Sequence, residues 1–391
     1  MTFFVLPVVT NHLDPATIEI QQGTPVIFIS KTLQEYLSVI KGEIDNCPVD
    51  WDYYKKFTNP YEYIQTQIPG ENYSVSSLKP LSRSYFKMIE IVKTHNILNS
   101  YKETPIKTFH LAEGPGGFIE AITHLRKNNK DTYHGMTLLN DTIGIPGWNK
   151  SSQFLKNNPN VIIEKGVDGK GDLYNFDNLK SCAEKYGNTM DIITGDGGFD
   201  FSVDFNDQET ASTRLLFSQI CFALSLQKKG GSFILKCFDC FNRSTIDLIY
   251  IIFMFYENCY ITKPLTSRIA NSERYIVCLN FKYENTTYLL PKWEAIYSQI
   301  ESSTGVKGFL NTPLPYYFIN KLEEINLIVG KTQIENILYT LKLIRQTNDN
   351  DHELKLSSIK KKNLDKCINW CKKYNIAYQT KIINNIFISD C

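Results

Sequence analysis

Apolar positions follow two alternating spacings between residues 83 and 281. Apolar side chains at Tyr85, Met88, Ile89 and Val92 have helical spacing and predict a helix over 83–98. The same spacing predicts further helices over 116–127, 176–186, 208–228 and 244–256, and short apolar runs predict strands over 106–112, 132–138, 160–164, 191–196, 232–236, 259–262 and 274–281. Strands that alternate with helices indicate an α/β fold with a mostly parallel, doubly wound sheet.

The two ends of the chain are less regular. Residues 1–80 mix apolar stretches with an aromatic-rich segment at 51–63, and we expect an N-terminal extension that packs on the main domain. In the tail, residues 316–345 have helical spacing, which predicts a helical C-terminal region. The expected division is therefore an extension over 1–80, a main domain over 81–285 and a mostly helical region over 286–391.

Composition narrows the class of protein. The 391 residues are 42% hydrophobic and 13% aromatic, which argues against disorder, and the net charge of +1 means that a polyanion would need local basic patches. No apolar run reaches membrane-spanning length, and the first residues do not resemble a signal peptide, so an intracellular, cytoplasmic or nuclear protein is expected. The ten cysteines lack framework spacing and are expected to be free. The pairs Cys237/Cys240 and Cys367/Cys371 fall short of a zinc site, and no metal is expected.

The stretch HLAEGPGGFIEA, residues 110–121, joins a predicted strand to a predicted helix through an acid and a glycine-rich turn. Glycines let a ligand approach the backbone, and a helix N-terminus offers free N–H groups. A carboxylate at Glu113 suits a cationic amino group better than a pyrophosphate. In S-adenosyl-L-methionine, the ammonium could face Glu113 while the turn N–H groups face the carboxylate. A purely structural turn is the alternative for this loop alone.

Polar residues also stand at other strand ends. Asp196 ends a buried strand and is followed by two glycines, Lys236 ends the next apolar run, and Glu273 directly precedes the strand Tyr275–Cys278. Carboxyl ends of parallel strands share one edge of a sheet, so Asp196 and Lys236 should lie beside the glycine turn. Lys87 lies in the predicted helix over 83–98, where a solvated lysine is the plain interpretation.

Over roughly residues 80–285 the chain resembles the FtsJ-type ribose 2′-O-methyltransferases. The resemblance rests on five separated elements: Lys87, LAEGPGGF, ITGDGG, ILKCF and SERYIVC. Within that family the chain most resembles the mRNA cap-specific branch of eukaryotes and large DNA viruses. Three features carry this resemblance: HGMTL at 134–138, FNDQE at 205–209, and the N- and C-terminal regions beyond the methyltransferase domain. The resemblance implies a Rossmann-like methyltransferase sheet, S-adenosyl-L-methionine as cofactor, and capped mRNA as substrate. It also implies a catalytic tetrad of Lys87, Asp196, Lys236 and Glu273. A viral source would add the virion or viral factory as a location.

The resemblance also implies binding residues. For the cofactor these are Glu113, Gly114, Pro115, Gly116, Gly117, Phe118, Met136, Asp172 and Asp196, with Asp168 as an alternative to Asp172 near the adenine. For the cap, the FNDQE segment gives Asn206 and Glu209. Arg83 and Arg268 are candidates for RNA contact from their place near the predicted rim, and Arg268 is favoured because its loop leads to Glu273. Lys150, Arg214 and Lys263 also lie near the predicted rim, and Trp148 and the aromatics of 59–63 are candidates for stacking on the cap.

Several alternatives remain open at this point. Lys236 could accept the 2′-hydroxyl proton as a neutral amine, or stay charged and stabilise the developing alkoxide. The substrate could be rRNA or tRNA, or the chain could be a catalytically silent RNA-binding scaffold; a nicotinamide dehydrogenase fits the glycine pattern poorly. The lysine-rich run between Lys355 and Lys373 could be a solvated helix face, an RNA surface, or a surface for the capping machinery or an RNA polymerase.

Overall fold

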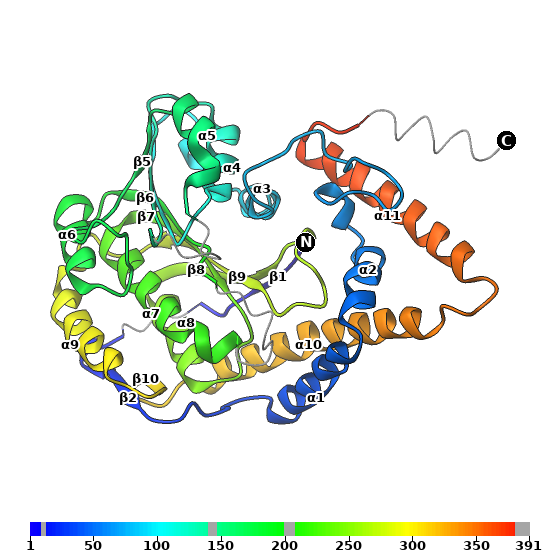
Figure 1. The fold of residues 1–391 in the computed structure, drawn as a ribbon. Helices are drawn as coiled ribbons and strands as arrows, with labels where there is room; N and C mark the ends of the chain where they lie inside the picture. The colour runs from blue at the N-terminus through cyan, green and yellow to red at the C-terminus, as the bar shows by residue number, and fades with distance from the viewer. Residues whose placement is uncertain (9–12, 140–146, 199–207, 380–391) are drawn as a thin grey trace.

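An eight-stranded sheet forms the centre of the molecule in the computed structural model, which describes residues 1–8, 13–139, 147–198 and 208–379 (Figure 1). Its order is β1-β8-β9-β7-β6-β3-β4-β5. The strands are β1 (Thr2–Val5), β3 (Lys107–Leu111), β4 (Thr132–Met136), β5 (Val161–Ile163), β6 (Met190–Gly195), β7 (Gln227–Cys237), β8 (Tyr256–Lys263) and β9 (Arg274–Phe281). β9 runs antiparallel to β7 and β8, and β1 antiparallel to β8, so the other strands share one direction.

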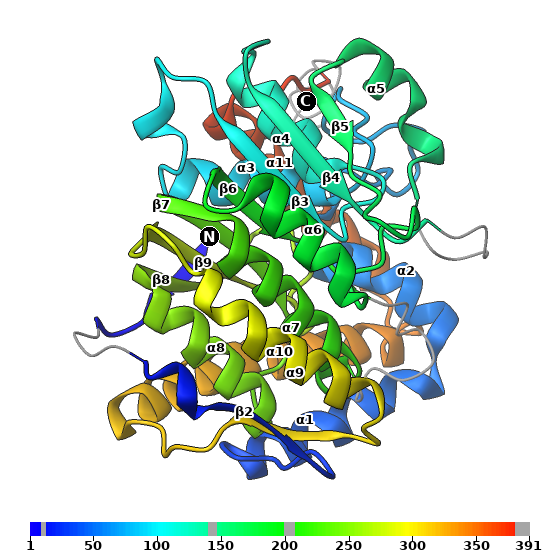
Figure 2. The same ribbon diagram turned by 90° about the vertical axis from the view of Figure 1, so that its left-hand side faces the viewer.

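Helices cover both faces of this sheet, as Figure 2 shows with the α6–α9 side toward the viewer. One face carries α3 (Ser84–Thr94), α4 (Gly117–Arg126) and α5 (Ser152–Asn157); the other carries α6 (Phe176–Tyr186), α7 (Gln208–Leu226), α8 (Arg243–Phe255) and α9 (Leu290–Glu301). Neighbouring strand residues alternate between the two cores: Ile193 packs in one and Ile192 in the other. The predicted Rossmann-like, doubly wound sheet is confirmed.

Most element boundaries agree with the sequence pattern, and three differences have physical causes. The helix predicted to reach residue 98 ends at Thr94, because Asn96 adopts a left-handed backbone conformation with φ of 54°. Gly230 and Gly231 do not separate α7 from the next strand, since β7 already starts at Gln227. The edge strand β1 lies in the predicted N-terminal extension, where no strand was expected, and pairs with β8.

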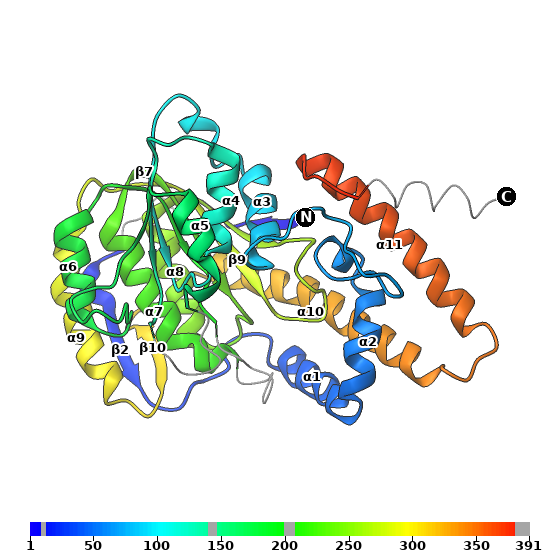
Figure 3. The same ribbon diagram turned by 45° about the horizontal axis from the view of Figure 1, so that its top comes forward.

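The two ends of the chain pack against each other. β2 (Ile18–Gln22) pairs with β10 (Val306–Leu310), and α1 (Lys31–Gly42) and α2 (Pro48–Thr58) lie against α10 (Tyr316–Arg345) and α11 (His352–Tyr374) (Figures 1 and 3). Apolar clusters join them, such as Tyr54 and Phe57 with Leu343 and Leu356. The predicted helical C-terminal region is therefore present, and the extension is held by it. The boundaries at residues 80 and 285 stay a prediction.

Three further findings concern the described residues alone. The nine cysteines among them are free thiols. They contain no group of three or more His, Cys, Asp or Glu side chains arranged to hold a metal ion. None of their helices is both long and apolar enough to cross a membrane.

Candidate active site

The strand order reverses between β3 and β6, which is where open α/β sheets form a ligand crevice at their carboxyl ends. Two backbone hydrogen bonds tie these ends together. Asp196 N donates to Leu111 O at 3.2 Å, and Glu113 N donates to Met136 O at 3.4 Å. The structure therefore brings Glu113, Met136 and Asp196, all predicted cofactor residues, to one point.

Glu113 uses one carboxylate oxygen to cap α4. Its Oε1 accepts hydrogen bonds from Phe118 N at 2.6 Å and Ile119 N at 3.3 Å. These two N–H groups at the helix start are therefore already bound, contrary to the expectation that the turn would offer them to a ligand carboxylate. Oε2 is buried and has no hydrogen-bond partner among the described residues. Burial, with the nearby Asp196 carboxylate, raises the pKa of Glu113 well above its usual value.

The glycines of the turn allow close packing of its neighbours. Gly116 has a φ of 106°, which disfavours any residue with a Cβ. A Cβ at Gly117 would collide with the hydroxyls of Ser82 and Ser84, so this glycine lets α4 start against α3, the helix of Lys87. Trp148 packs on Gly116, is only 8% exposed, and so is not available to stack on a cap.

The loop after β5 lies against the end of β4. Leu139 N donates to Lys170 O at 2.6 Å, which joins this loop to the segment after Met136. Asp172 accepts a hydrogen bond from Tyr174 N at 2.8 Å and is partly exposed, and Asp168 accepts one from Lys170 N at 2.8 Å. Both candidate adenine-side acids therefore lie on the loop that borders the crevice, and each already stabilises a turn.

Lys236 and Asp196 form the first half of the predicted tetrad. The Lys236 ammonium lies 3.2 Å from Asp196 Oδ1 and donates to Asp196 O at 2.7 Å. Tyr275, opposite Lys236 in the β7–β9 register, donates its hydroxyl to Asp196 Oδ1 at 3.3 Å. Both charged side chains are partly accessible, at 13% and 16% exposure, so a substrate can reach them.

Lys87 and Glu273 form the second half. Lys87 Nζ donates to Glu273 Oε2 at 2.7 Å, and Glu273 Oε1 has no hydrogen-bond partner among the described residues. Burial alone would raise the pKa of Glu273, but Lys87, Lys236 and Lys263 lower it to about 2. The side chain therefore stays a carboxylate at neutral pH. Its interaction with Lys236 places the two ion pairs beside each other.

The two arginines predicted to contact RNA share one carboxylate. Glu62, in the 3-10 helix Glu62–Ile64, lies 3.2 Å from Arg83 and 2.7 Å from Arg268, and its own side chain is 1% exposed. Burial would raise the pKa of Glu62, but hydrogen bonds and charge from the two arginines lower it. Arg83 precedes α3 and Arg268 lies in the loop before Glu273, so Glu62 fixes both beside the tetrad.

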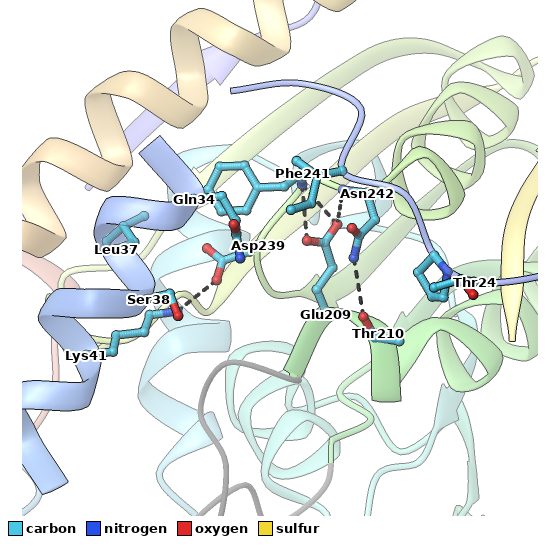
Figure 4. Close-up of a pocket in the computed structure, with 12 residues that line it drawn as sticks. Thr24, Gln34, Leu37, Ser38, Lys41, Glu209, Thr210, Asp239, Phe241 and Asn242 are labelled. Carbon is cyan, nitrogen blue, oxygen red and sulfur yellow. Dashed lines mark hydrogen bonds and ion pairs between the residues drawn. The ribbon is translucent and has the colours of Figure 1, made fainter. Parts of the chain in front are cut away.

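Of the two residues predicted to read the cap, Asn206 lies outside the described residues. Glu209 is buried and accepts hydrogen bonds from Phe241 N at 2.9 Å and Asn242 N at 2.8 Å (Figure 4). It borders a pocket of about 300 Å³ between α1 and the chain after β7. Burial raises the pKa of Glu209 well above its usual value. The Glu209 carboxylate therefore binds the backbone N–H groups of Phe241 and Asn242, and it also lines the pocket.

The sequence pattern missed how several residues support the site. Lys263, considered as an RNA contact, is half-buried behind Glu273, and its amine is engaged by the protein: Nζ donates to Asn271 O at 2.7 Å, Asn271 Oδ1 at 2.6 Å and Glu273 O at 2.7 Å. Glu90 is buried and accepts from Leu265 N at 2.9 Å and Thr266 N at 2.8 Å, which anchors the loop of Arg268. A charged residue on an otherwise apolar helix face was the available signal for Glu90.

A scan against family models matches residues 80–281 to FtsJ-like methyltransferase, which is just over half of the chain. The chain belongs to the FtsJ-like methyltransferase family. The match begins just before Arg83 and ends with β9, and therefore includes every member of the tetrad.

Several curated proteins that are similar to this chain are cap-specific mRNA methyltransferases by name. A cap-specific mRNA (nucleoside-2′-O-)-methyltransferase 1 of Leishmania braziliensis is 31% identical over 270 residues, 64% of this chain and 63% of that protein. The type 2 protein of Danio rerio is 27% identical over 338 residues, 80% of this chain and 43% of that protein. The type 1 protein of Trypanosoma brucei brucei is 34% identical over 170 residues, 43% of this chain and 45% of that protein. The chain thus spans about half the length of these relatives.

Solved structures superpose loosely. Human methyltransferase-like protein 13, 13% identical, matches 60% of this chain and 95% of its own with a TM-score of 0.35. The fold follows from the strand order itself.

The FtsJ-like family indicates S-adenosylmethionine as the methyl donor, and the crevice fits such a molecule. The buried, unpartnered Oε2 of Glu113 is suited to a cationic amino group. Asp172 borders the same crevice from the loop beyond β5. Glu113 and Asp172 are therefore the residues that would hold the donor.

Proposed function

We propose that this protein methylates the ribose 2′-hydroxyl of the nucleotide next to the 5′ cap of mRNA. The observation that carries the proposal is the pairing of Lys236 with Asp196 and of Lys87 with Glu273 at the carboxyl edge of the sheet. Relatives named cap-specific mRNA 2′-O-methyltransferases support the choice of substrate. In this assignment residues 81–285 perform the reaction, and the regions on either side of them contribute to RNA binding.

The tetrad suits a proton-coupled attack by a ribose oxygen. Bound S-adenosylmethionine supplies the methyl group, and the protein must orient the 2′-oxygen and handle its proton. Lys236 Nζ is the group placed to do so, either by accepting the proton or by stabilising the alkoxide. Asp196 holds Lys236 in place, whereas Glu273 balances the charge of Lys87. Positioning of the two reacting atoms supplies much of the acceleration in either case.

The test is methyl transfer to short RNAs that differ only at the 5′ end: N7-methylated cap, unmethylated cap, triphosphate and hydroxyl. We expect transfer to capped RNA alone and loss of label when the target ribose lacks a 2′-hydroxyl. Transfer to uncapped RNA, or to rRNA or tRNA fragments, would overturn the cap assignment and keep the 2′-O-methyltransferase. Absence of transfer to any RNA, with donor binding intact, would favour the scaffold alternative.

Lys236→Ala should lower single-turnover transfer by about 10²–10⁴-fold, the usual range for a general base, while donor affinity stays unchanged. Lys236→Arg separates the two roles of the amine, because a guanidinium cannot be neutral near pH 7. An active arginine variant would favour the charged role. Wild-type rates in Lys236→Ala would show that the tetrad assignment is wrong.

The pocket beside Glu209 is the candidate site for the cap guanosine. It lies between the N-terminal extension and the methyltransferase sheet, and Figure 4 shows Lys41 of α1 paired with Asp239 at 3.0 Å across it. Asp239 follows Lys236 by three residues, about 10 Å of extended chain. The triphosphate bridge of a cap spans a similar distance between the guanosine and the target ribose. A pocket here can therefore hold one end while Lys236 meets the other.

Filling the pocket tests this placement. Ser38 of α1 lines it, so Ser38→Tyr should raise the KM for capped RNA at least tenfold and leave donor affinity unchanged. Val39 on the same helix is 65% exposed and outside the pocket lining, which makes Val39→Tyr the matched control. Equal KM values for both variants would place the cap elsewhere without affecting the methyltransferase assignment.

A further inference from the structure

Four lysines of α11 lie in one row along the helix. Lys355, Lys362, Lys366 and Lys373 are separated by seven, four and seven residues. At 3.6 residues per turn these positions fall within about 40° of one another around the helix axis. The row is about 27 Å long at 1.5 Å per residue. We call these four residues the lysine row.

Three of the four lysines of the row are exposed, and Lys355 is half-buried. Lys362, Lys366 and Lys373 are exposed and form no ion pair with a described residue, while Lys355 reaches the side-chain oxygen of Gln346 at 3.1 Å. Five other exposed lysines pair with acids, in Lys31–Glu35, Lys185–Glu164, Lys228–Asp191, Lys229–Glu284 and Lys331–Glu335. Single unpaired lysines such as Lys102, Lys130 and Lys180 are exposed elsewhere on the described surface, so the lysine row is distinguished by its alignment along one helix.

The charge is concentrated on this helix. Residues 352–379 contain seven lysines against two acids, Glu353 and Asp365, although the whole chain has a net charge of only +1. The remainder of the chain is therefore net negative. Asp365 lies about 80° around the helix from the row. Such a local surplus attracts a polyanion that the protein as a whole would not.

α11 is tied to the framework that carries the candidate RNA contacts. Asn363 donates to Phe57 O at 2.7 Å, and the ring of Trp370 packs on Phe86 of α3 with centroids 5.8 Å apart. The 57–63 segment carries Glu62, which holds Arg83 and Arg268, and α3 carries Lys87. The lysine row therefore lies on a helix that packs directly against the elements carrying Glu62 and Lys87.

We propose that the lysine row binds the phosphates of single-stranded RNA downstream of the methylated nucleotide. The inference rests on the proposed function for its choice of RNA. A row of 27 Å spans several nucleotides, within the range of about 4–16 that single-stranded binding sites cover. Lysine ammonium groups contact phosphates as point charges without reading sequence, so binding here is independent of the transcript.

The test compares Lys362→Ala/Lys366→Ala/Lys373→Ala with a matched control, Lys102→Ala/Lys130→Ala/Lys180→Ala. The control lysines are exposed and lie near the amino ends of β3 and β4 or on α6. Binding of an uncapped, labelled 30-nucleotide RNA is followed by fluorescence anisotropy from 50 to 200 mM salt. Methylation is followed in parallel with a capped dinucleotide and a capped 30-nucleotide RNA.

The logarithm of RNA affinity falls linearly with the logarithm of salt concentration, and the loss of three phosphate contacts makes this fall less steep by about 2. The ratio of wild-type affinity to variant affinity should therefore decrease about 20-fold between 50 and 200 mM salt. The row variant should show this change and a raised KM for the long capped RNA, with the capped dinucleotide unaffected. The control triple should match the wild type.

A row variant with the salt slope of the wild type would overturn the proposal and point to a protein partner, such as a subunit of the capping machinery or an RNA polymerase. The binding arm needs no methylation. Failure of the wild type to methylate capped RNA, with a reduced slope in the row variant, would therefore count against the proposed function and support the lysine row.

Discussion

Lys263 offers the sharpest test of the electrostatics around the tetrad. Its side chain is half-buried and its ammonium lies behind Glu273; burial, with Arg274 and Lys87 nearby, lowers its pKa from 10.5 to about 7 despite the attraction of Glu273 and Asp239. The substitution Lys263→Met keeps the length and volume of the side chain while removing the titrating group. The expected effect is a change in how stability depends on pH.

The sign and size of this effect follow from linkage. A base whose pKa is lowered by folding binds fewer protons in the folded state than in the unfolded state between pH 7 and 10.5. Stability of the wild type therefore rises with pH in this window, by about 1.4 kcal/mol per pH unit at most. Between pH 7 and 9 the gain is about 2 kcal/mol. Below pH 7 both states are protonated and the charged amine costs a constant amount.

Urea unfolding of wild type and Lys263→Met from pH 6 to pH 9 measures this directly. The difference between the two free energies of unfolding should shift by about 2 kcal/mol toward the wild type from pH 7 to pH 9. Lys228→Met, at a side chain that is 55% exposed, is the control and should leave the profile parallel to the wild type.

A parallel profile for Lys263→Met would refute the reasoning. It would mean that the three acceptors around Nζ, which match the three donors of an ammonium, offset the cost of burial. The variant also loses its hold on Asn271 and Glu273, so its turnover should fall at every pH.

Two further predictions concern residues that position the site. Gly117→Ala should destabilise the protein by about 1–3 kcal/mol and lower turnover, because the new Cβ pushes α4 away from Ser82 and from Ser84, the first residue of the Lys87 helix. Gly147→Ala, with nothing within 4 Å of its Cβ, is the thermal-denaturation control. Glu62→Gln should cost on the order of 3 kcal/mol and weaken RNA binding, since it leaves two cations without their shared carboxylate; unchanged RNA affinity in a folded variant would remove Arg83 and Arg268 from the RNA path.

Much of the fold could be predicted because the spacing of apolar residues decides it. The boundaries of α6, β9 and α10 agree with the pattern to the residue, since each of these elements buries an apolar face in a hydrophobic cluster. β1 could not be predicted. It is a four-residue edge strand whose side chains are mostly exposed, so its place depends on β8, which lies more than 250 residues away.

The residues of the candidate site could be predicted only in part, because their contacts depend on the three-dimensional structure. Asp196 and Lys236 could be predicted as site residues because each ends an apolar run, and a charged residue at the end of a buried strand is unusual unless it is paired or functional. Whether a carboxylate faces a ligand or the backbone depends on geometry that the sequence does not contain. Glu113 and Glu209 have the same residue type and similar settings beside a helix start, and both turned out to accept backbone N–H groups. The contacts of Lys263 with Asn271 and Glu273 could not be predicted, because these acceptors lie in the loop before β9, eight to ten residues further along the chain.

The balance of charge around the tetrad follows the chemistry proposed for it. At the centre, Lys236 faces Asp196 and Lys87 faces Glu273, so the two pairs are close to neutral together. One step outward, Arg83 and Arg268 share the single carboxylate of Glu62, which leaves one positive charge. On α11 the lysine row has no paired acid among the described residues. The unpaired positive charge therefore lies outside the two ion pairs of the tetrad, which suits the proposed substrate, because its reacting hydroxyl is neutral and its phosphates are charged. A strongly cationic centre would hold phosphate in place of the ribose, so neutrality at the tetrad favours the correct register of the RNA.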